Sequence, residues 1–562
     1  MTEPTAIDEI ATRFWDAHLR LSPLTATTYG DGRFDDRLDD PGPEGRAARV
    51  AVARQAADEA LAIPADGLGV EDRITRDMLR IAAELAERDA ALGFHELAAV
   101  DHMQGPQTVL AQVAQFQPAD SPERLEKFLA RLEAYGGFMD AYIRILDEGR
   151  ASGRTAARIV VERTIDQLKR LLAMPIGQAV VPSMAQVASD ADRERVRDVV
   201  RDVVYPADRR YLEALSGAYL EASREVPGLA SAPNGEELYR HAVRAWTTLD
   251  LDPRDVHQIG LEELASIDAE RLEIARAEGF GDDVAGYRAV LAADPANRAS
   301  TREELVARAT GDITRAMAVA PTMFGRLPSA SCEVRPVEEF KEKDVAFAYY
   351  FSPAADGSRD GIYYVNTYDL PSRNFSKLAS TTFHEAVPGH HFQIALEMEH
   401  PNLNVFRRLG SRIVGGAYVE GWGLYAERLA DEMGLYRNPG ERMGMLDAQA
   451  WRASRLVVDS GMHGLGWTRR QSIDWLLRTG LSDTDALIET DRYICWPGQA
   501  LCYMTGMREI RRLRRELEAR DGSRFDLRAF HDEVIGHGSL PLATLAAELP
   551  GWVSPKLSSA GG

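Results

Sequence analysis

Cysteine is scarce in this sequence of 562 residues, which contains three: Cys332, Cys495 and Cys502. Three thiols so far apart cannot build a disulfide framework or a cysteine-rich metal site, which argues against a small secreted scaffold. Long apolar runs are also missing, since no segment approaches the roughly 18 consecutive apolar residues of a membrane-spanning helix. These two deficits favour a protein of a reducing, cytoplasmic compartment.

Basic charge is deficient as well. The chain has 66 Lys and Arg residues against 87 Asp and Glu residues, a net charge of -21 at pH 7, and no basic run offsets this locally. A nucleic acid or an anionic membrane surface would be repelled, so neither is an expected partner. Residues 1–20 carry acidic side chains early and no uninterrupted apolar stretch, so they predict an ordinary helix rather than a signal peptide.

Helical periodicity dominates what is present. Apolar residues recur three and four apart through most of the chain, and three segments begin with a helix-capping pattern: Ser121-Pro122, Thr301 to Glu304 and Thr468 to Gln471. One region differs, because β-branched and aromatic residues at 345–350 and 362–366 flank the turn-rich segment 353–361. We therefore expect a mostly α fold with one small β-hairpin.

A soft boundary is expected near Val226 to Gly235, where two prolines and two glycines interrupt the helical pattern. It predicts an N-terminal helical lobe over residues 1–230 and a C-terminal helical lobe over residues 231–562. The C-terminal lobe would carry the hairpin, about 345–366, and a candidate metal site at 384–427. We expect the two lobes to form one enzyme rather than independent modules.

The residues with chemical potential concentrate directly after the hairpin. Within eight residues of an expected helix lie His384, Glu385, His390 and His391. In the common zinc-hydrolase signature, two histidines one helical turn apart bind the metal, and the glutamate beside the first deprotonates the attacking water. Here Pro388 occupies the place of the second histidine and cannot be a ligand. Since proline also disrupts a helix, we expect a kink or bulge inside the motif.

In a regular helix neither later histidine could share a metal with His384. His390 would point about 120° away from it, and His391 would lie about 10.5 Å along the helix axis. A bulge that absorbs two extra residues would bring His390 into place, and one that absorbs three would bring His391. The residues alone leave both open.

The next expected helix offers a third ligand. Residues 418–427 read Tyr-Val-Glu-Gly-Trp-Gly-Leu-Tyr-Ala-Glu and place Glu420 and Glu427 seven residues apart on one face. The aromatic neighbours predict a buried helix, although two solvated surface charges are the plain alternative. Glu420 is the expected third metal ligand and Glu427 the alternative.

These motifs resemble those of the bacterial family called domain of unknown function 885 (DUF885). The resemblance rests on His-Glu-x-x-Pro-Gly-His-His at 384–391, Tyr-Tyr-Val-Asn at 363–366, Glu-Gly-Trp-x-x-Tyr-x-Glu at 420–427, and the segments 455–467 and 496–506. That family is similar in turn to the helical carboxypeptidase Taq metallopeptidases, in which a second glutamate follows the third ligand by seven residues.

The resemblance implies a helical, cleft-bearing metallopeptidase-like fold with Glu420 as a metal ligand. It also favours His390 over His391, because the second histidine of the pair is not always histidine in the family. The motif here is longer than the usual zinc-hydrolase signature, and fold alone does not determine activity.

Together these observations predict a zinc-dependent hydrolase that cleaves peptide bonds, carboxypeptidase-like or oligopeptidase-like. One Zn²⁺ per chain would be held by His384, His390 and Glu420, with an open position for water. Glu385 is the expected general base. The expected partner is a peptide or small-molecule substrate, and a homodimer is compatible with the sequence.

Further site residues are predicted from their positions near these motifs. His463 and Tyr503 are candidates to stabilise the oxyanion. The candidate substrate contacts are Tyr364, Asn366, Gln499 and Arg455; an extended peptide could pair with the strand that ends in the first two. Two other functions remain open: hydrolysis or lysis of a small non-peptide amide or ester with the help of a metal, and a metal-free relative that acts as a binding protein.

Overall fold

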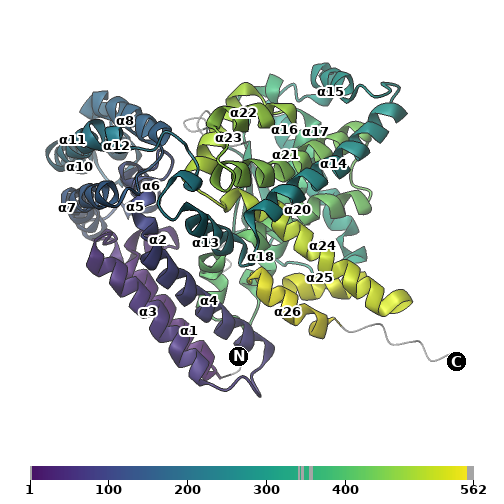
Figure 1. Ribbon diagram of the computed structural model, residues 1–562, viewed down its shortest axis with the longest axis horizontal. Coiled ribbons are helices and arrows are strands. Elements are labelled where there is room, and N and C mark those ends of the chain that lie inside the picture. Colours follow the sequence, from purple (N-terminus) through teal and green to yellow (C-terminus); the bar gives the residue numbers. More distant parts are fainter. Residues whose placement is uncertain (1–2, 339–341, 343–346, 354–358, 554–562) are drawn as a thin grey trace.

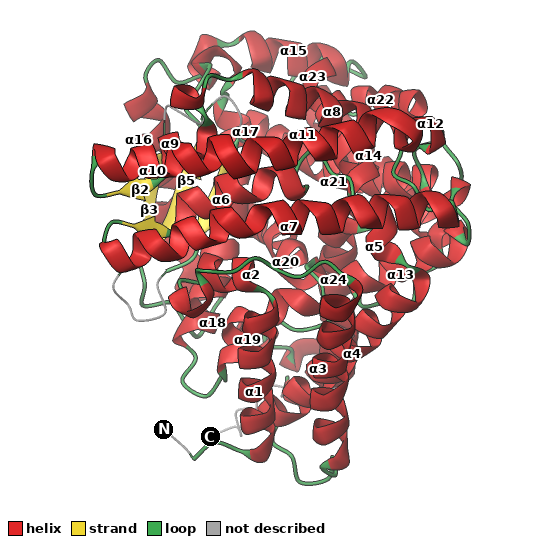
Figure 2. Cartoon of the chain, turned by 90° about the vertical axis from the view of Figure 1, so that its left-hand side faces the viewer, coloured by secondary structure: helices red, strands yellow, loops and turns green. Residues whose placement is uncertain are grey.

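The computed structural model describes residues 3–338, 342, 347–353 and 359–553. The fold is mostly α, as the sequence predicts, and the strands are few and short (Figures 1 and 2). The helices of the first part are α1 (Ala6–Leu21), α2 (Pro23–Thr28), α3 (Pro43–Ala62), α4 (Val70–Leu92), α5 (Phe94–Leu97), α6 (Val109–Phe116), α7 (Pro122–Ser152), α8 (Arg158–Ala173), α9 (Val180–Met184), α10 (Asp190–Val199), α11 (Tyr205–Ala214) and α12 (Leu220–Ala222).

The remaining helices follow the expected boundary near residue 230. They are α13 (Gly235–Thr247), α14 (Pro253–Ala277), α15 (Val284–Ala293), α16 (Arg302–Val319), α17 (Phe375–Glu385), α18 (His390–Glu399), α19 (Val405–Leu409), α20 (Ala417–Glu432), α21 (Pro439–His463), α22 (Arg469–Arg478), α23 (Asp483–Cys495), α24 (Cys502–Asp521), α25 (Leu527–Gly536) and α26 (Leu542–Trp552). In this part α20 packs on α24, and α17 packs on both α20 and α21.

The predicted caps begin their helices as expected, with one difference. The Ser121 hydroxyl accepts from the backbone N–H of Arg124 at the start of α7, and Thr468 forms the reciprocal capping box with Gln471. Thr301 accepts from the N–H of Glu304, but the Glu304 carboxylate accepts from the N–H of residue 300 instead of that of Thr301. Only half of that predicted box forms.

The predicted hairpin is present within a three-stranded sheet. Strand β4 (Ala348–Phe351) pairs antiparallel with β5 (Gly361–Val365), and β3 (Cys332–Pro336) pairs parallel with the other side of β5. Residues 345–346 and 354–358 of the expected hairpin lie outside the described residues. A second pair of two-residue strands joins β1 (Pro118–Ala119) to β2 (Gln186–Val187). The central position of β5 means that both of its backbone edges are already paired.

Two hydrophobic clusters make up the interior. One combines residues 7–97 with residues 229–457 and 501–553, and the other combines residues 99–219 with Ala500 and parts of α21, α22 and α23. The chain crosses between the clusters near residue 98 and again near residue 229. The predicted boundary near residue 230 lies at the second crossing, and the division into lobes 1–230 and 231–562 stays a prediction.

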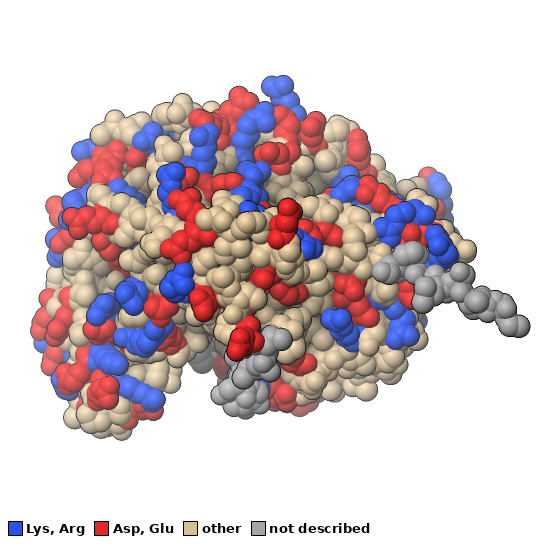
Figure 3. Space-filling view, turned by 90° about the horizontal axis from the view of Figure 1, so that it is seen from below, with Lys and Arg blue, Asp and Glu red and all other residues tan. Residues whose placement is uncertain are grey.

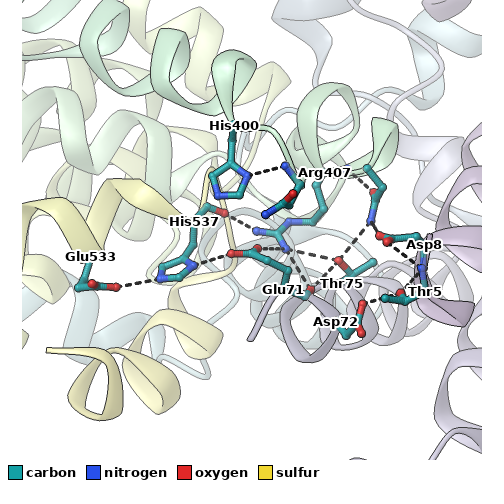
Figure 4. Close-up of polar contacts among 11 residues, drawn as sticks. Thr5, Asp8, Glu71, Asp72, Thr75, His400, Arg407, Glu533 and His537 are labelled. Carbon is teal, nitrogen blue, oxygen red and sulfur yellow. Dashed lines mark hydrogen bonds and ion pairs between the residues drawn. The ribbon is translucent and has the colours of Figure 1, made fainter. Parts of the chain in front are cut away.

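The first helices contact the last ones directly. Arg73 of α4 pairs with Glu548 of α26 at 2.8 Å, and Thr544 of α26 donates to Asp77 of α4. Beside them, His537 lies between Glu71 of α4 at 2.6 Å and Glu533 of α25 at 3.0 Å (Figure 4). The two ends of the chain are thus joined by ion pairs and hydrogen bonds.

The molecular surface carries acidic and basic side chains in mixture, without a large area of one sign on the face shown (Figure 3). Among the described residues, no helix combines the length and the apolar composition that a bilayer crossing requires.

Candidate metal centre

The histidine motif spans a complete break between two helices. Helix α17 ends at Glu385 and α18 begins at His390, and the backbone between them leaves the helical region at Ala386 (φ -110°, ψ -98°) and Gly389 (φ -80°, ψ -130°). The sequence predicts a kink or bulge inside the motif, and the structure has a complete break between two helices at that place. Pro388 has no N–H to donate and its ring collides with the preceding turn, so the first helix stops.

New hydrogen bonds satisfy the backbone across this break. The N–H of Phe392 donates to the carbonyl of Ala386 at 3.2 Å, six residues back. The indole N–H of Trp422 in α20 donates to the carbonyl of Pro388 at 2.9 Å. Buried carbonyls without a partner would be costly, and these contacts replace the lost helical bonds. Trp422 also ties the loop to the helix that carries Glu420.

The break brings three predicted ligands together. The rings of His384 and His390 lie 4.6 Å apart and almost perpendicular, and the Nε2 atom of each lies 3.5 Å from Oε2 of Glu420. All three ligand atoms fall within 4.8 Å of one another. Donors bound to one zinc at about 2.0–2.1 Å stand about 3.3 Å apart in a tetrahedral site. The donor set and its spacing therefore fit a single zinc ion.

His391 has other partners. Its Nε2 lies 3.1 Å from the carbonyl of Ala330, and its Nδ1 lies 3.0 Å from the hydroxyl of Tyr350 on β4. Burial lowers the pKa of His391 to about 4, so the ring is neutral, with one nitrogen donating and the other accepting. Both nitrogens are engaged by the β-sheet region, and His390 rather than His391 reaches Glu420.

Glu427, the alternative ligand, instead supports His384 from behind. Its Oε1 lies 2.9 Å from Nδ1 of His384, and its Oε2 accepts from Ser380 at 2.9 Å and from Gln449 at 3.3 Å. A carboxylate that accepts from Nδ1–H fixes the ring orientation and leaves the Nε2 lone pair for a metal. Glu427 is fully buried, so this contact is not shared with solvent.

The carboxylates give this centre an electrostatic environment that favours positive charge. Burial opposes a charge on His384, yet hydrogen bonds with Glu420 and Glu427 raise its pKa to about 9. Burial likewise opposes the charge of Glu420, but its contacts with His384 and His390 hold its pKa well below the usual range. A position that attracts a proton so strongly also favours a cation, which takes the place of that proton when a metal binds.

A glycine of α20 leaves room for both imidazole rings. A Cβ atom at Gly423 would lie 2.8 Å from Nε2 and Cε1 of His384 and 3.0 Å from Cε1 of His390. Real Cβ atoms do not approach other heavy atoms this closely, so any larger residue would displace the rings. The missing side chain forms the cradle in which the two histidines meet.

Glu385 lies at the last turn of α17, between these histidines and the sheet. Burial raises its pKa, and the neighbouring His390 and His384 lower it in part. Its charge in turn helps to raise the pKa values of Cys332 on β3 and Tyr363 on β5, in addition to their burial. A carboxyl group with a raised pKa next to a metal position suits proton transfer near neutral pH.

Tyr503 of α24 lies next to His384. The two rings are 6.3 Å apart and inclined by 24°. Burial, together with the charge of Glu420, raises the pKa of Tyr503 to about 12, so the phenol keeps its proton near neutral pH. The structure thus places one predicted oxyanion donor beside the predicted ligands.

Two glycines allow this approach of α24 to α20. A Cβ atom at Gly421 would lie 2.4 Å from Cα of Gly506, and one at Gly506 would lie 1.9 Å from the carbonyl oxygen of Ala417. The helices touch through their backbones at this point. Any side chain at either position would push Tyr503 away from the centre.

The second oxyanion candidate, His463, is occupied elsewhere. Its Nδ1 accepts from the N–H of Leu229 at 3.1 Å, and its Nε2 lies 2.9 Å from the carbonyl of Tyr493. Burial lowers its pKa to about 4. A neutral imidazole with both nitrogens bound to backbone groups has no donor left for a substrate, so the catalytic role predicted for His463 has no support in this geometry.

The predicted substrate contacts on β5 have structural roles instead. Asn366 is fully buried, donates to the carbonyl of Glu342 at 2.7 Å and accepts from the N–H of Tyr368 at 3.0 Å. Tyr364 stacks on Tyr349 of β4 at 4.9 Å. Because β5 is the central strand, the expectation that a peptide pairs with it was wrong.

The two remaining predicted contacts lie near Tyr503. Gln499, in the turn before α24, accepts from Arg492 at 2.5 Å. Arg455 of α21 lies with its guanidinium carbon 4.3 Å from the Tyr503 ring centroid. Sequence reasoning missed Arg452, whose Nη2 lies 3.8 Å from Oε1 of Glu427. Its position one turn before Arg455 in the same helix was the available signal.

A second group of potential metal donors exists among the described residues. It consists of Asp101, His102 and Cys495. The Asp101 carboxylate already accepts from the N–H of Met103 and from the indole of Trp496, and the Cys495 thiol lies 3.4 Å from His102. These partners account for the polar atoms without an ion.

The protein is a mostly α chain in which three helices, α17, α18 and α20, bring two histidines and a glutamate together at the break between the first two. The chain belongs to the family described as bacterial protein of unknown function (DUF885), whose profile matches residues 23–549. Comparison with curated proteins found no match.

Two solved structures share the fold. A candidate lipoprotein from Colwellia psychrerythraea is 28% identical, with a TM-score of 0.90 over 98% of this chain and 99% of its own. A candidate lipoprotein of unknown function from Shewanella oneidensis is 19% identical, with a TM-score of 0.76 over 97% of this chain and 100% of its own. The second likeness concerns the fold alone.

Proposed function

We propose that this protein is a zinc-dependent hydrolase that cleaves peptide bonds. The observation that carries the proposal is the convergence of His384 Nε2, His390 Nε2 and Glu420 Oε2, with Glu385 directly after the first ligand in the chain. The similarity of the family to the carboxypeptidase Taq metallopeptidases supports a peptide substrate, since their paired glutamates have the spacing of Glu420 and Glu427.

The proposed reaction assigns a role to each of these side chains. A zinc ion at this centre would lower the pKa of a bound water toward about 7 and polarise the scissile carbonyl. Glu385 accepts the proton of the attacking water and returns it to the leaving amine nitrogen. The new C–O bond forms first and leaves the negative charge on the former carbonyl oxygen; the C–N bond then breaks as this oxyanion collapses, giving a carboxylate and an amine. Tyr503 donates its phenolic proton in a hydrogen bond to the oxyanion that develops between these steps.

The charge-neutral variant Glu385→Gln tests this assignment. Because Glu385 is not among the three ligands, the variant should keep about one zinc per chain by elemental analysis. Its kcat on a peptide substrate should fall by roughly 10²-fold to 10⁴-fold, since it cannot accept the proton. Wild-type turnover by Glu385→Gln would contradict the role of the general base.

The same preparations separate the competing functions. A panel of peptides and of small non-peptide amides and esters distinguishes a peptidase from a hydrolase or lyase of small molecules. A wild-type chain that binds no zinc, even when zinc is supplied, would favour a metal-free binding protein. His384→Ala and Glu420→Ala should each abolish zinc retention, because two strong donors are too few.

For the cellular location we keep the proposal of the cytoplasm, which rests on the scarcity of cysteine. The two solved relatives carry the competing description of lipoproteins, which would place such proteins at a membrane surface. Cell fractionation with immunodetection of the native protein decides between them, since a lipoprotein sediments with membranes.

A further inference from the structure

Arg455 is buried beside the candidate metal centre with part of its guanidinium group unused. The residue is 4% exposed, and among the described residues its Nη1 atom has no hydrogen-bond partner. Its Nε donates to the hydroxyl of Tyr493 at 3.0 Å, and its Nη2 lies 3.3 Å from Glu489. A buried, charged donor without an acceptor is unfavourable, so this atom indicates a missing anionic or polar partner.

A second guanidinium group lies beside it. The guanidinium carbon of Arg452 is 4.9 Å from the ring of Trp451 and 6.0 Å from the ring of Tyr503, and that of Arg455 is 4.3 Å from both. The two cations thus share the same pair of aromatic rings. Stacking on aromatic faces holds guanidinium groups in place while their edges remain able to bind an anion.

Few carboxylates compensate this concentration of positive charge. Glu489 is shared between Arg455 and Arg492, which it approaches to 2.8 Å. Glu427 lies 3.8 Å from Arg452 but also serves His384 at 2.9 Å. In a chain with a net charge of -21, a cluster of three arginines with two shared carboxylates is a local excess of cations. An anionic ligand would relieve it.

Two residues, Tyr503 and Glu427, connect the arginine cluster to the metal centre. The Tyr503 ring lies 4.3 Å from the guanidinium carbon of Arg455 and 6.3 Å from the His384 ring, so the guanidinium is no farther from the His384 ring than these two distances together. Glu427 links Arg452 to the same histidine. An extended residue spans about 3.5 Å, so an anion bound here lies within about three residues of a carbonyl at the centre.

We propose that Arg455, with Arg452 beside it, binds the free C-terminal carboxylate of a peptide substrate. The unused Nη1 of a guanidinium group can donate charge-assisted hydrogen bonds to a carboxylate, whereas a C-terminal amide offers no negative charge. This inference rests on the proposed peptidase function and makes it specific: the enzyme removes one to three residues from the carboxyl end of short peptides. Internal bonds of long chains are not its substrates.

Matched peptide pairs test the proposal. N-acetylated tripeptides with small, aromatic, acidic or basic C-terminal residues are prepared as free acids and as C-terminal amides, and the zinc-loaded full-length chain is assayed with each. The free acids should be cleaved with a kcat/KM at least about 30-fold above that of the amides. In Arg455→Met, the free-acid value should fall to that of the amide, which itself should change little.

Two variants control for folding and for charge. Arg455→Lys keeps the charge without the planar fork and should show an intermediate loss. Arg428→Met removes an arginine of α20 that pairs with Glu270 at 2.8 Å and 3.0 Å, and it should leave the ratio of acid to amide unchanged. Zinc content and melting temperature, measured on each preparation, show whether a variant still folds around its metal.

Binding separates this inference from the proposed function. The same peptide pairs are titrated calorimetrically into the zinc-loaded Glu385→Gln chain, with and without Arg455→Met. Selective binding of the free acids through Arg455 supports the subsite even if no bond is cleaved by the wild type. Equal cleavage of acids and amides would overturn the subsite and leave the peptidase standing. Failure of the acids to bind at millimolar concentration, or equal binding of acids and amides, would also overturn it.

Discussion

Glu427 determines which nitrogen of His384 faces the metal position. Its carboxylate accepts from Nδ1–H at 2.9 Å and is itself held by Ser380 and Gln449. The ring can then present only its Nε2 lone pair to a metal. A ligand held in one orientation loses less freedom when the metal binds, and its basicity rises through the charged partner.

We predict that Glu427→Gln keeps the fold but weakens zinc binding by about 10-fold to 100-fold, because the amide cannot supply the negative charge behind His384. Competition with a chromogenic chelator measures this affinity. Glu420→Gln, which alters a ligand, should lose more. An unchanged zinc affinity in Glu427→Gln would show that the hydrogen bond without its charge is sufficient.

Tyr503→Phe removes one oxygen atom next to the centre. If the phenol donates to the oxyanion, kcat should fall by roughly 10²-fold, while zinc content and KM barely change. Steady-state kinetics and a melting curve on one preparation test this. A hydroxyl that only satisfies a neighbouring group would give the reverse, with kcat retained and stability lowered by about 1 kcal/mol.

At the scale of elements, the centre depends on how closely α20 approaches the break between α17 and α18. Gly423 provides the space in which the two imidazole rings meet, and Trp422 holds the loop through the carbonyl of Pro388. Two neighbouring residues of α20 therefore act together: Gly423 leaves space for the imidazole rings, and Trp422 fixes the loop that leads directly to His390.

We predict that Gly423→Ala lowers zinc affinity at least about 10-fold although alanine favours helices, since its Cβ would lie 2.8 Å from the ring of His384. Gly311→Ala in α16 is the matched control, because a Cβ atom there meets nothing within 4 Å. That variant should be as stable as the wild type or slightly more stable, by up to about 1 kcal/mol. Equal zinc affinities in both variants would contradict the conclusion that Gly423 provides the space for the two imidazole rings.

Local patterns predicted the elements of the site better than their junctions. Helical spacing placed Glu420 and Glu427 on one face of a largely buried helix, and aromatic runs located the hairpin. Strand β3 escaped notice because it pairs in parallel with β5, at a distance along the chain that no turn signal marks. The disruption at Pro388 was expected as a kink or bulge, and its extent could not be predicted because its stabilising partner, Trp422, comes from another helix.

The misjudged residues share a physical cause. His463 and Asn366 are polar residues near motifs, which the sequence cannot distinguish from site residues. In the structure both are buried and bound to backbone groups contributed by distant segments, Leu229 and Tyr493 for the histidine. Which polar side chain serves the backbone and which serves a ligand is decided by tertiary packing alone.

At the scale of the whole molecule, His537 joins the N-terminal helices to the C-terminal ones through its contacts with Glu71 and Glu533. Burial would lower the pKa of His537, but its hydrogen bonds with Glu533 and Glu71 outweigh burial and raise it. The pKa of Glu71 is lowered: burial opposes its charge, but the hydrogen bond with His537 and the charge of Arg407 prevail. Figure 4 shows this group between α4 and the C-terminal helices.

These shifts determine the pH range in which the contact stabilises the fold. A raised pKa for His537 gives a contribution that is complete below about pH 6.5 and is lost as the pH rises through the folded-state pKa. The contribution of Glu71 is present above its ordinary pKa of about 4.5 and is lost in acid. The pair therefore stabilises the protein most between about pH 4.5 and 6.5.

We predict that His537→Gln lowers the free energy of unfolding by on the order of 1 kcal/mol at pH 6, after allowance for partial exposure, and by less at pH 9. Urea unfolding of both proteins at the two pH values measures the difference. A loss of equal size at pH 6 and pH 9 would show that the charge of His537 contributes nothing.

The contact of α4 with α26 has a consequence for folding during synthesis on the ribosome. Arg73 cannot form its ion pair until Glu548, 475 residues later in the chain, has been synthesised. A ribosome that adds about 5–20 residues per second takes roughly half a minute to a minute and a half to synthesise that interval. During this time the apolar faces of the first helices have emerged without the residues that will cover them. The nascent chain thus has to be shielded from aggregation, by chaperones or by provisional contacts, until translation is almost complete.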